Sequence, residues 1–371
     1  MPKRMRFIVP RNRPWNTSHD FWRILLQTPI LTRRRFTAAL GLSLVAAGTF
    51  ARAAAPSRKV VALDLTALDT LDAMGIEPSM VPAPPSGEST ARWPSHLIAQ
   101  YGQDKYAKLP AGRAGEGEPN PQLQQVAAFA PDLIVSGSRG RGGSADAFKD
   151  IAPVVVLSVD NARFVESIAG NVASLGAALG QEALGRREAD ALRTRVRTLH
   201  SSAARQGTGL VMFNVGSRVM PQQSDARFGM LYELIGIRSA LSPDDGAGGL
   251  GSGRPPANNA ANADDPAAKA AAEIEQKARQ AAEAKYLADA LAHEPDWLFV
   301  VDRNAAFGEL KAAETMAATP AVANSRAWRQ NKVVFLDQDG ASWYLMAGSL
   351  GLLNNTVGLV QAAFDQHDAG R

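Results

Sequence analysis

The chain has no cysteine among its 371 residues. Disulfide bonds, thiolate metal sites, cysteine nucleophiles and a cysteine-linked lipid anchor are therefore excluded. The four histidines that follow residue 53 stand at no metal-ligand spacing from one another. No glycine-rich phosphate loop follows the first predicted strand, and no order of serine, histidine and aspartate marks a catalytic triad. The sequence gives no positive indication of an enzyme.

Positive charge is concentrated in the N-terminal segment. The formal net charge of the whole chain is +4, but residues 1–53 contain ten lysine and arginine side chains against one aspartate. That segment therefore carries +9, which leaves −5 for the rest of the chain. A net-acidic remainder removes the electrostatic support for a nucleic-acid partner.

Residues 1–53 have the layout of a twin-arginine export signal preceded by extra N-terminal residues. Residues 32–36 read Thr-Arg-Arg-Arg-Phe, an apolar stretch covers residues 36–48, and residues 51–53 read Ala-Arg-Ala, a small-x-small cleavage pattern. An uncleaved membrane anchor is the alternative, but the apolar stretch is short for a bilayer. We expect a soluble periplasmic protein that is exported folded.

Two stretches 164 residues apart share one pattern. Residues 131–139 and residues 295–303 each contain a Pro-Asp turn, a short apolar run and an arginine eight residues after the proline. A second similarity links residues 68–76 with residues 230–237, which both end in Gly-Ile. Apolar runs without alternation indicate strands buried on both faces of a parallel sheet. The sequence therefore predicts an α/β fold of two lobes with central, largely parallel sheets.

The predicted domain organisation follows from this repeat. We expect an N-terminal lobe over residues 54–161, a connecting helix over residues 162–181 and a C-terminal lobe over residues 182–371. The connecting helix is predicted from an apolar stripe at helical spacing over residues 164–179, although an ordinary crossover helix has the same pattern. Residues 242–266 form a low-complexity insertion with too little apolar surface to order easily.

Three arginines are candidate ligand residues. Ligands of open α/β sheets bind beyond the carboxyl ends of the strands, where Arg139 and Arg303 lie. Arg227 stands just before the predicted helix over residues 230–237. Guanidinium groups stay charged and donate hydrogen bonds in a planar fork, so three of them predict an anionic ligand. An ordinary surface salt bridge is the alternative for Arg227.

Two aromatic residues complete the candidate site. Trp343 and Tyr344 follow a predicted strand over residues 333–336, again at a carboxyl end. Packing in the core is the alternative reading of this pair. A tyrosine phenolate is also a hard oxygen ligand that suits ferric iron.

In these residues the chain resembles the periplasmic ferric-siderophore-binding proteins of ABC importers, in the subgroup that takes catecholate-type siderophores. The resemblance covers about residues 59–364. It rests on segments that occur in the same order as in the family, at 68–75, 103–107, 131–137, 224–229, 295–304, 333–337 and 343–344. It implies two α/β lobes joined by a single long helix, and a binding protein with no cofactor of its own beyond the ferric iron carried in the siderophore. It places ligand arginines at Arg139, Arg227 and Arg303, and the iron-binding tyrosine at Tyr344.

One feature departs from that family. Its second iron ligand is a loop histidine whose position falls in residues 242–266, and this stretch contains no histidine. Either Tyr344 acts alone or the siderophore itself fills the iron coordination. The resemblance also implies a monomer that delivers its ligand to an inner-membrane ABC permease. The alternatives are a binding protein for haem or another anionic metal chelate such as a corrinoid, and a periplasmic hydrolase of siderophore esters.

Overall fold

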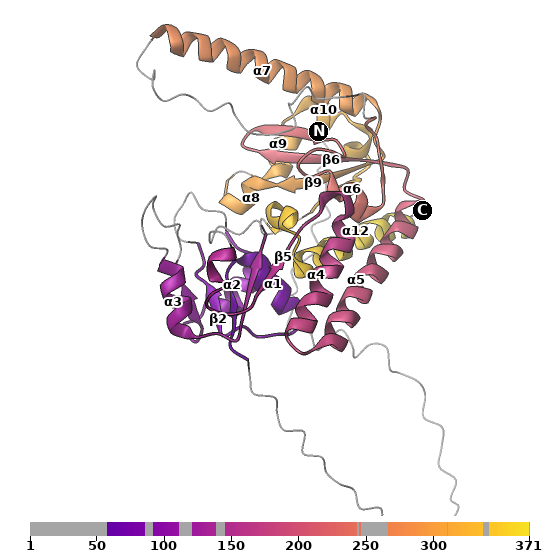
Figure 1. The fold of residues 1–371 in the computed structure, drawn as a ribbon. Coiled ribbons are helices and arrows are strands. Elements are labelled where there is room, and N and C mark those ends of the chain that lie inside the picture. Colours follow the sequence, from indigo (N-terminus) through magenta and orange to yellow (C-terminus); the bar gives the residue numbers. More distant parts are fainter. Residues whose placement is uncertain are drawn as a thin grey trace, which may run out of the picture. The chain divides into compact units, whose positions relative to one another are not determined.

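The computed structural model describes residues 58–85, 92–110, 121–138, 145–242, 245, 266–309, 311–336 and 341–370. Residues 58–371 form one compact unit, which contains two five-stranded sheets with helices beside them (Figure 1). None of the helices in the described ranges combines the length and apolar character needed to cross a bilayer. The predicted export signal at residues 1–53 lies outside the described residues, as does most of the insertion at 242–266.

The first sheet is parallel throughout. Across the sheet, the strands are β3 (Ala107–Leu109), β2 (Met80–Pro82), β1 (Val60–Ala62), β4 (Leu133–Gly137) and β5 (Val154–Leu157). The α-helices of this lobe are α1 (Leu65–Ala73), α2 (Ser95–Tyr101) and α3 (Pro121–Phe129), with a 3₁₀ turn η1 (Ala145–Phe148) before β5. All five residues of β4 are buried, as expected for a central strand covered on both faces.

The second sheet is parallel except at one edge. Its strands are β10 (Val333–Phe335), β9 (Trp297–Asp302), β6 (Thr208–Val215) and β7 (Arg218–Gln222), with β8 (Arg238–Ser239) paired to β6. Strand β7 runs antiparallel to β6. The helices are α6 (Met230–Ile235), α7 (Pro266–Ala292), α8 (Arg303–Phe307), α9 (Ala312–Ala317), α10 (Pro320–Ala323) and α11 (Arg326–Arg329).

The repeated Pro-Asp turn has the same structural role in both lobes. In the first lobe, Asp132 Oδ2 accepts the backbone N–H of Lys59 at 2.7 Å, just before β1. In the second lobe, Asp296 Oδ2 accepts the backbone N–H of Thr208 at 2.9 Å, at the start of β6. Each carboxylate therefore joins the start of one strand to the start of its neighbour: β1 to β4 in the first lobe and β6 to β9 in the second. The parallel trio β1, β4 and β5 corresponds to β6, β9 and β10.

Two packed helices carry the chain from the first sheet to the second. Helix α4 (Phe164–Ala178) lies within the predicted connecting segment, after a short 3₁₀ turn η2 (Asn161–Arg163), and α5 (Glu182–Ala203) returns beside it (Figure 1). The two helices approach closely at Gly176 and Gly185, where a Cβ on Gly176 would lie 2.5 Å from the Cα of Gly185. The C-terminal helix α12 (Leu350–Ala369) packs on both α5 and α1. One hydrophobic core runs through these helices and into both lobes.

Candidate ligand-binding site

Trp343 lies at the centre of an aromatic cluster in the second lobe. It belongs to η5 (Ala341–Ala347), a 3₁₀ helix in the segment between β10 and α12. Its ring stacks on Phe213 with centroids 5.9 Å apart and meets Phe307 edge-on at 6.2 Å. Phe228 is 6.5 Å away. Because Trp343 is only half-buried, the indole packs against the core and still leaves part of its surface exposed to solvent.

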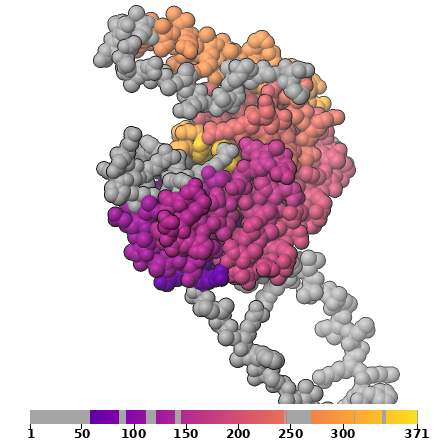
Figure 2. Space-filling model, in the orientation of Figure 1, coloured from indigo at the N-terminus to yellow at the C-terminus, as the bar shows by residue number. Residues whose placement is uncertain are grey.

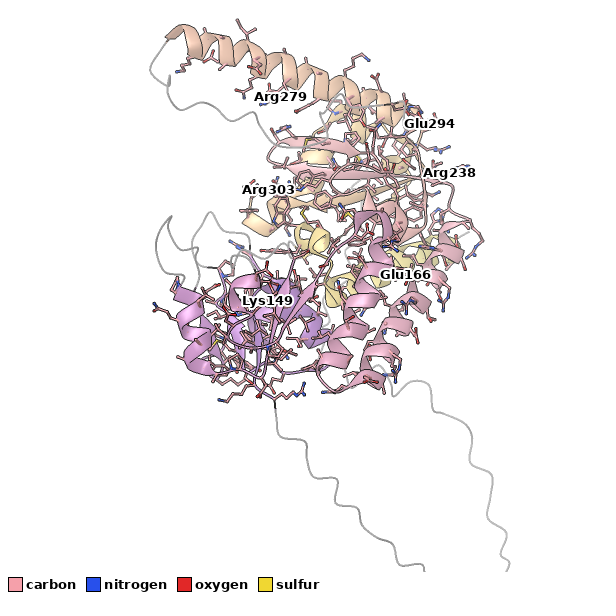
Figure 3. All side chains as sticks on the ribbon, in the orientation of Figure 1. Lys149, Glu166, Arg238, Arg279, Glu294 and Arg303 are labelled. Carbon is pink, nitrogen blue, oxygen red and sulfur yellow. The ribbon has the colours of Figure 1, made fainter. Side chains whose placement is uncertain are left out.

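Two of the three predicted arginines converge on this indole. The guanidinium carbon of Arg227 lies 4.7 Å from the Trp343 ring centroid, and that of Arg303 lies 5.8 Å from it. Both distances are within the range of cation–π attraction. Arg303 also lies over the Phe307 ring at 3.9 Å, and Arg227 contacts the sulfur of Met346 at 3.8 Å. Arg303 extends from α8 (Figure 3).

A hydrogen-bond network around the buried residues Asp302 and Ser342 supports the positions of Arg303 and Trp343. The Asp302 carboxylate caps α8 through the N–H of Ala305 at 3.2 Å and also accepts the N–H of Ala312 at 2.8 Å. The backbone N–H of Asp302 donates to the Ser342 hydroxyl at 3.1 Å. Arg303 directly follows Asp302 in the chain, and Trp343 directly follows Ser342. The network therefore sets the register between β9 and η5, and with it the spacing of the two side chains.

Arg303 is held by a carboxylate in this structure. Its Nη1 lies 3.3 Å from Oε1 of Glu309, and the side chains are 25% and 44% exposed, respectively. An ion pair with this exposure contributes little to stability. Glu309 therefore acts mainly on the local potential, since it offsets part of the positive charge beside Trp343.

Tyr344 and Arg139 are the remaining two of the predicted site residues. Tyr344 is half-buried in η5 and packs against the main core. Arg139 lies outside the described residues. The strand that leads to it ends at Gly137, whose N–H donates to the Asp64 carboxylate at 2.7 Å. Burial raises the pKa of Asp64 above its ordinary value, with its hydrogen bonds acting in the opposite direction. The carboxyl end of β4 is thus anchored by the half-buried Asp64 carboxylate, as the end of β9 is by the buried Asp302.

The described residues contain no group of three or more histidine, aspartate or glutamate side chains placed to hold a metal ion. His200 contacts the carbonyl oxygen of Glu233 at 2.8 Å. The other described histidines lie beside aspartates: His96 near Asp69, His293 near Asp245 and His367 near Asp368.

In the space-filling view, residues of the C-terminal part of the chain, coloured yellow, reach the molecular surface (Figure 2).

Residues 60–339 match the family described as periplasmic binding protein. The petrobactin-binding protein YclQ of Bacillus subtilis is 25% identical over 301 residues, 81% of this chain and 80% of that protein. Its crystal structure superposes with a TM-score of 0.60 and covers 83% of this chain and 92% of YclQ.

Two further solved structures share the fold. The siderophore-binding protein BauB, bound to a complex of two acinetobactin molecules and ferric iron, gives a TM-score of 0.59 at 19% identity, over 83% of this chain and 92% of BauB. The periplasmic catecholate-siderophore-binding protein VctP of Vibrio cholerae gives 0.59 at 20% identity, over 82% of this chain and 93% of VctP. The predicted α/β fold of two lobes is confirmed.

Proposed function

Because the chain belongs to the periplasmic binding protein family, we propose that it captures an anionic ferric siderophore, with catecholate types favoured, and delivers it to an inner-membrane ABC permease. The observation that carries this proposal is the convergence of Arg227 and Arg303 on the half-buried indole of Trp343.

The chemistry of this cluster matches a ferric catecholate. Such a complex combines three positive charges on iron with six negative charges on catecholate oxygens, so it is a bulky trianion. Guanidinium groups supply fixed positive charge and planar donor forks for those oxygens. The flat catechol rings also suit the indole face and the cationic planes. Partial removal of water strengthens these charge interactions relative to an open surface.

The relatives support the ligand class. YclQ is named for petrobactin, BauB is bound to ferric acinetobactin, and VctP is named for catecholate siderophores. They are named as binding proteins, which favours capture over hydrolysis of a siderophore ester. In this reading iron is cargo: it arrives and leaves inside the siderophore.

Tyr344 is the candidate protein ligand for that iron. It adjoins Trp343 in η5, and its phenolate would be a hard oxygen donor for a ferric ion whose siderophore leaves a position open. A siderophore with six donor atoms needs no such contact, and Tyr344 then packs against the guest.

Localisation and delivery complete the proposal. The twin-arginine pattern in residues 1–53 supports export of the folded protein to the periplasm. Acidic surface residues of the net-negative remainder are the expected contacts for basic residues of the permease.

Tryptophan fluorescence tests the proposed function. The purified protein is titrated with ferric complexes of catecholate, hydroxamate and carboxylate ligands, and with haemin. We expect saturable quenching that is tightest with the catecholate complex, and a smaller quench in Trp343→Phe. Tighter binding of haemin than of the catecholate complex would identify haem as the ligand in place of a siderophore. Turnover of an intact siderophore ester would show that the protein is a hydrolase.

A further inference from the structure

Arg92 connects the first lobe to the helix that bears Arg303. It lies in the segment between β2 and α2, and its backbone N–H donates to the carbonyl oxygen of Ala306 in α8 at 2.7 Å. Its guanidinium lies against Gly308, at the end of α8. A Cβ placed on Gly308 would be 2.6 Å from Nη2 and 2.8 Å from Cζ of Arg92.

Gly308 meets two demands at once. Its φ of +70° lies in the left-handed region, which glycine adopts without a steric penalty. Its missing side chain also leaves the space that the Arg92 guanidinium fills. The end of a helix presents carbonyl oxygens, so a cation at this place is favoured. The Arg92 guanidinium therefore lies at the C-terminal end of α8, and its side chain is exposed there.

This position is beside the Trp343 cluster. Gly308 directly follows Phe307, whose ring lies 3.9 Å from the guanidinium carbon of Arg303 and 6.2 Å from the ring centroid of Trp343. Within the described part of the chain, none of the ion pairs involves Arg92. A guanidinium has five N–H donors, so the contact with Gly308 leaves donors available to a guest.

We propose that Arg92 is a specificity-determining residue that contacts the anionic guest from the first lobe and favours highly charged ferric complexes. The inference rests on the proposed function. Arg227 and Arg303 carry two positive charges against the three negative charges of a trianion, and Glu309 offsets part of the charge of Arg303. Even with Arg139 added, the three predicted arginines would not fully balance such a guest. Arg92 supplies a further full charge from the first lobe, and it does so at the end of the same helix that begins with Arg303.

The test uses three variants of the full-length chain and a ferric tris-catecholate complex as probe. Arg92→Gln removes the charge, Arg92→Lys keeps it without the planar fork, and Arg187→Gln is the control on the exposed face of α5. We expect Arg92→Gln to weaken binding about tenfold, as for loss of one charge-assisted hydrogen bond. Its affinity should also fall less steeply with added salt than that of the wild type. Arg92→Lys should keep the wild-type salt dependence, and Arg187→Gln should bind as the wild type does.

The outcomes separate this inference from the proposed function. If the wild type binds the complex and Arg92→Gln binds it equally well, the role of Arg92 is overturned. The same holds if both Arg92 variants lose affinity equally with an unchanged salt dependence, because Arg92 would then only join the two lobes. If the wild type itself binds no ferric complex, the proposed function fails first.

Discussion

The carboxylate of Glu233 caps the first turn of α4 by accepting the backbone N–H of Phe164 at 2.8 Å. Its second oxygen accepts the N–H of Val165 at 3.1 Å. The opposite lobe has a matching contact: Asp69 of α1 accepts the N–H of Leu352 at 3.0 Å, in the first turn of α12. In each half, an α-helix that comes after the last strand of the sheet therefore begins against a carboxylate from a helix of the other half: Glu233 of α6 for α4, and Asp69 of α1 for α12.

Removal of the Glu233 cap should lower stability. We expect Glu233→Ala to reduce the free energy of unfolding by about 1–2 kcal/mol, because two N–H groups lose their acceptor and the α4 dipole loses an anion. Urea unfolding measures the change. Glu182→Ala, at the exposed start of α5, is the control and should cost less than about 0.5 kcal/mol. Equal losses in the two variants would remove the special role of Glu233.

The same contacts should limit movement of the lobes. Because both α4 and α12 are fixed at their first turns to the opposite half, ligand binding should change the radius of gyration very little. Small-angle scattering with and without a ferric catecholate complex measures this. A large compaction on binding would show that these helix contacts yield.

Glu309→Gln should strengthen the binding of anionic complexes by a few fold. The substitution removes the negative charge that pairs with Arg303 at 3.3 Å and leaves the size of the side chain unchanged. Fluorescence titration at low salt measures the gain. Glu314→Gln, on the exposed face of α9, is the matched control and should leave affinity unchanged. Weaker binding by Glu309→Gln would mean that Glu309 supports the site rather than opposing the guest.

Tyr344→Phe should change the visible charge-transfer band of the bound ferric complex more than it changes fold stability. The ring keeps its packing in η5, whereas the hydroxyl is the candidate iron ligand. Absorption spectra of the loaded protein, together with thermal unfolding of the free protein, distinguish the two effects. An identical band in variant and wild type would place Tyr344 outside the iron shell.

Asp64 should make stability fall as pH rises. Burial raises its pKa in the folded state above the ordinary value of 3.8, so the unfolded chain loses its proton first. The contribution of protonated Asp64 is therefore present below about pH 4 and is lost as pH rises through the folded pKa. Urea unfolding at several pH values should show this slope in the wild type and a flatter one in Asp64→Asn. Parallel slopes would show that Asp64 titrates normally.

The sequence predicted the repeat well because its signals are local and structural. The Pro-Asp turns at Asp132 and Asp296 recur because each clasps two strands of its own sheet. Gly75 and Gly236 end equivalent helices with φ of 70° and 73°, a conformation that favours glycine. The three-residue strands β2 and β3 gave no such signal, and β7 contains a proline, Pro221, which obscures a strand pattern.

The site was predictable only in part. Arg227 and Arg303 could be proposed because each stands beside a recognisable element, and the structure brings both to Trp343. The role of Asp302 and Ser342 could not, because their hydrogen bond joins residues 40 positions apart and has no local pattern. Arg92 was missed for the same reason: its contact with Gly308 exists only after the two lobes have folded together.

The reciprocal capping of α4 and α12 makes the two halves mutually dependent. A fragment that stopped before Leu350 would lack the Leu352 N–H that Asp69 accepts, and a fragment that began after α4 would lack the N–H groups of Phe164 and Val165 that Glu233 accepts. Each half therefore loses a helix-capping contact when it is produced without the other. The two similar halves are thus joined reciprocally, because each supplies the carboxylate at which a helix of the other begins.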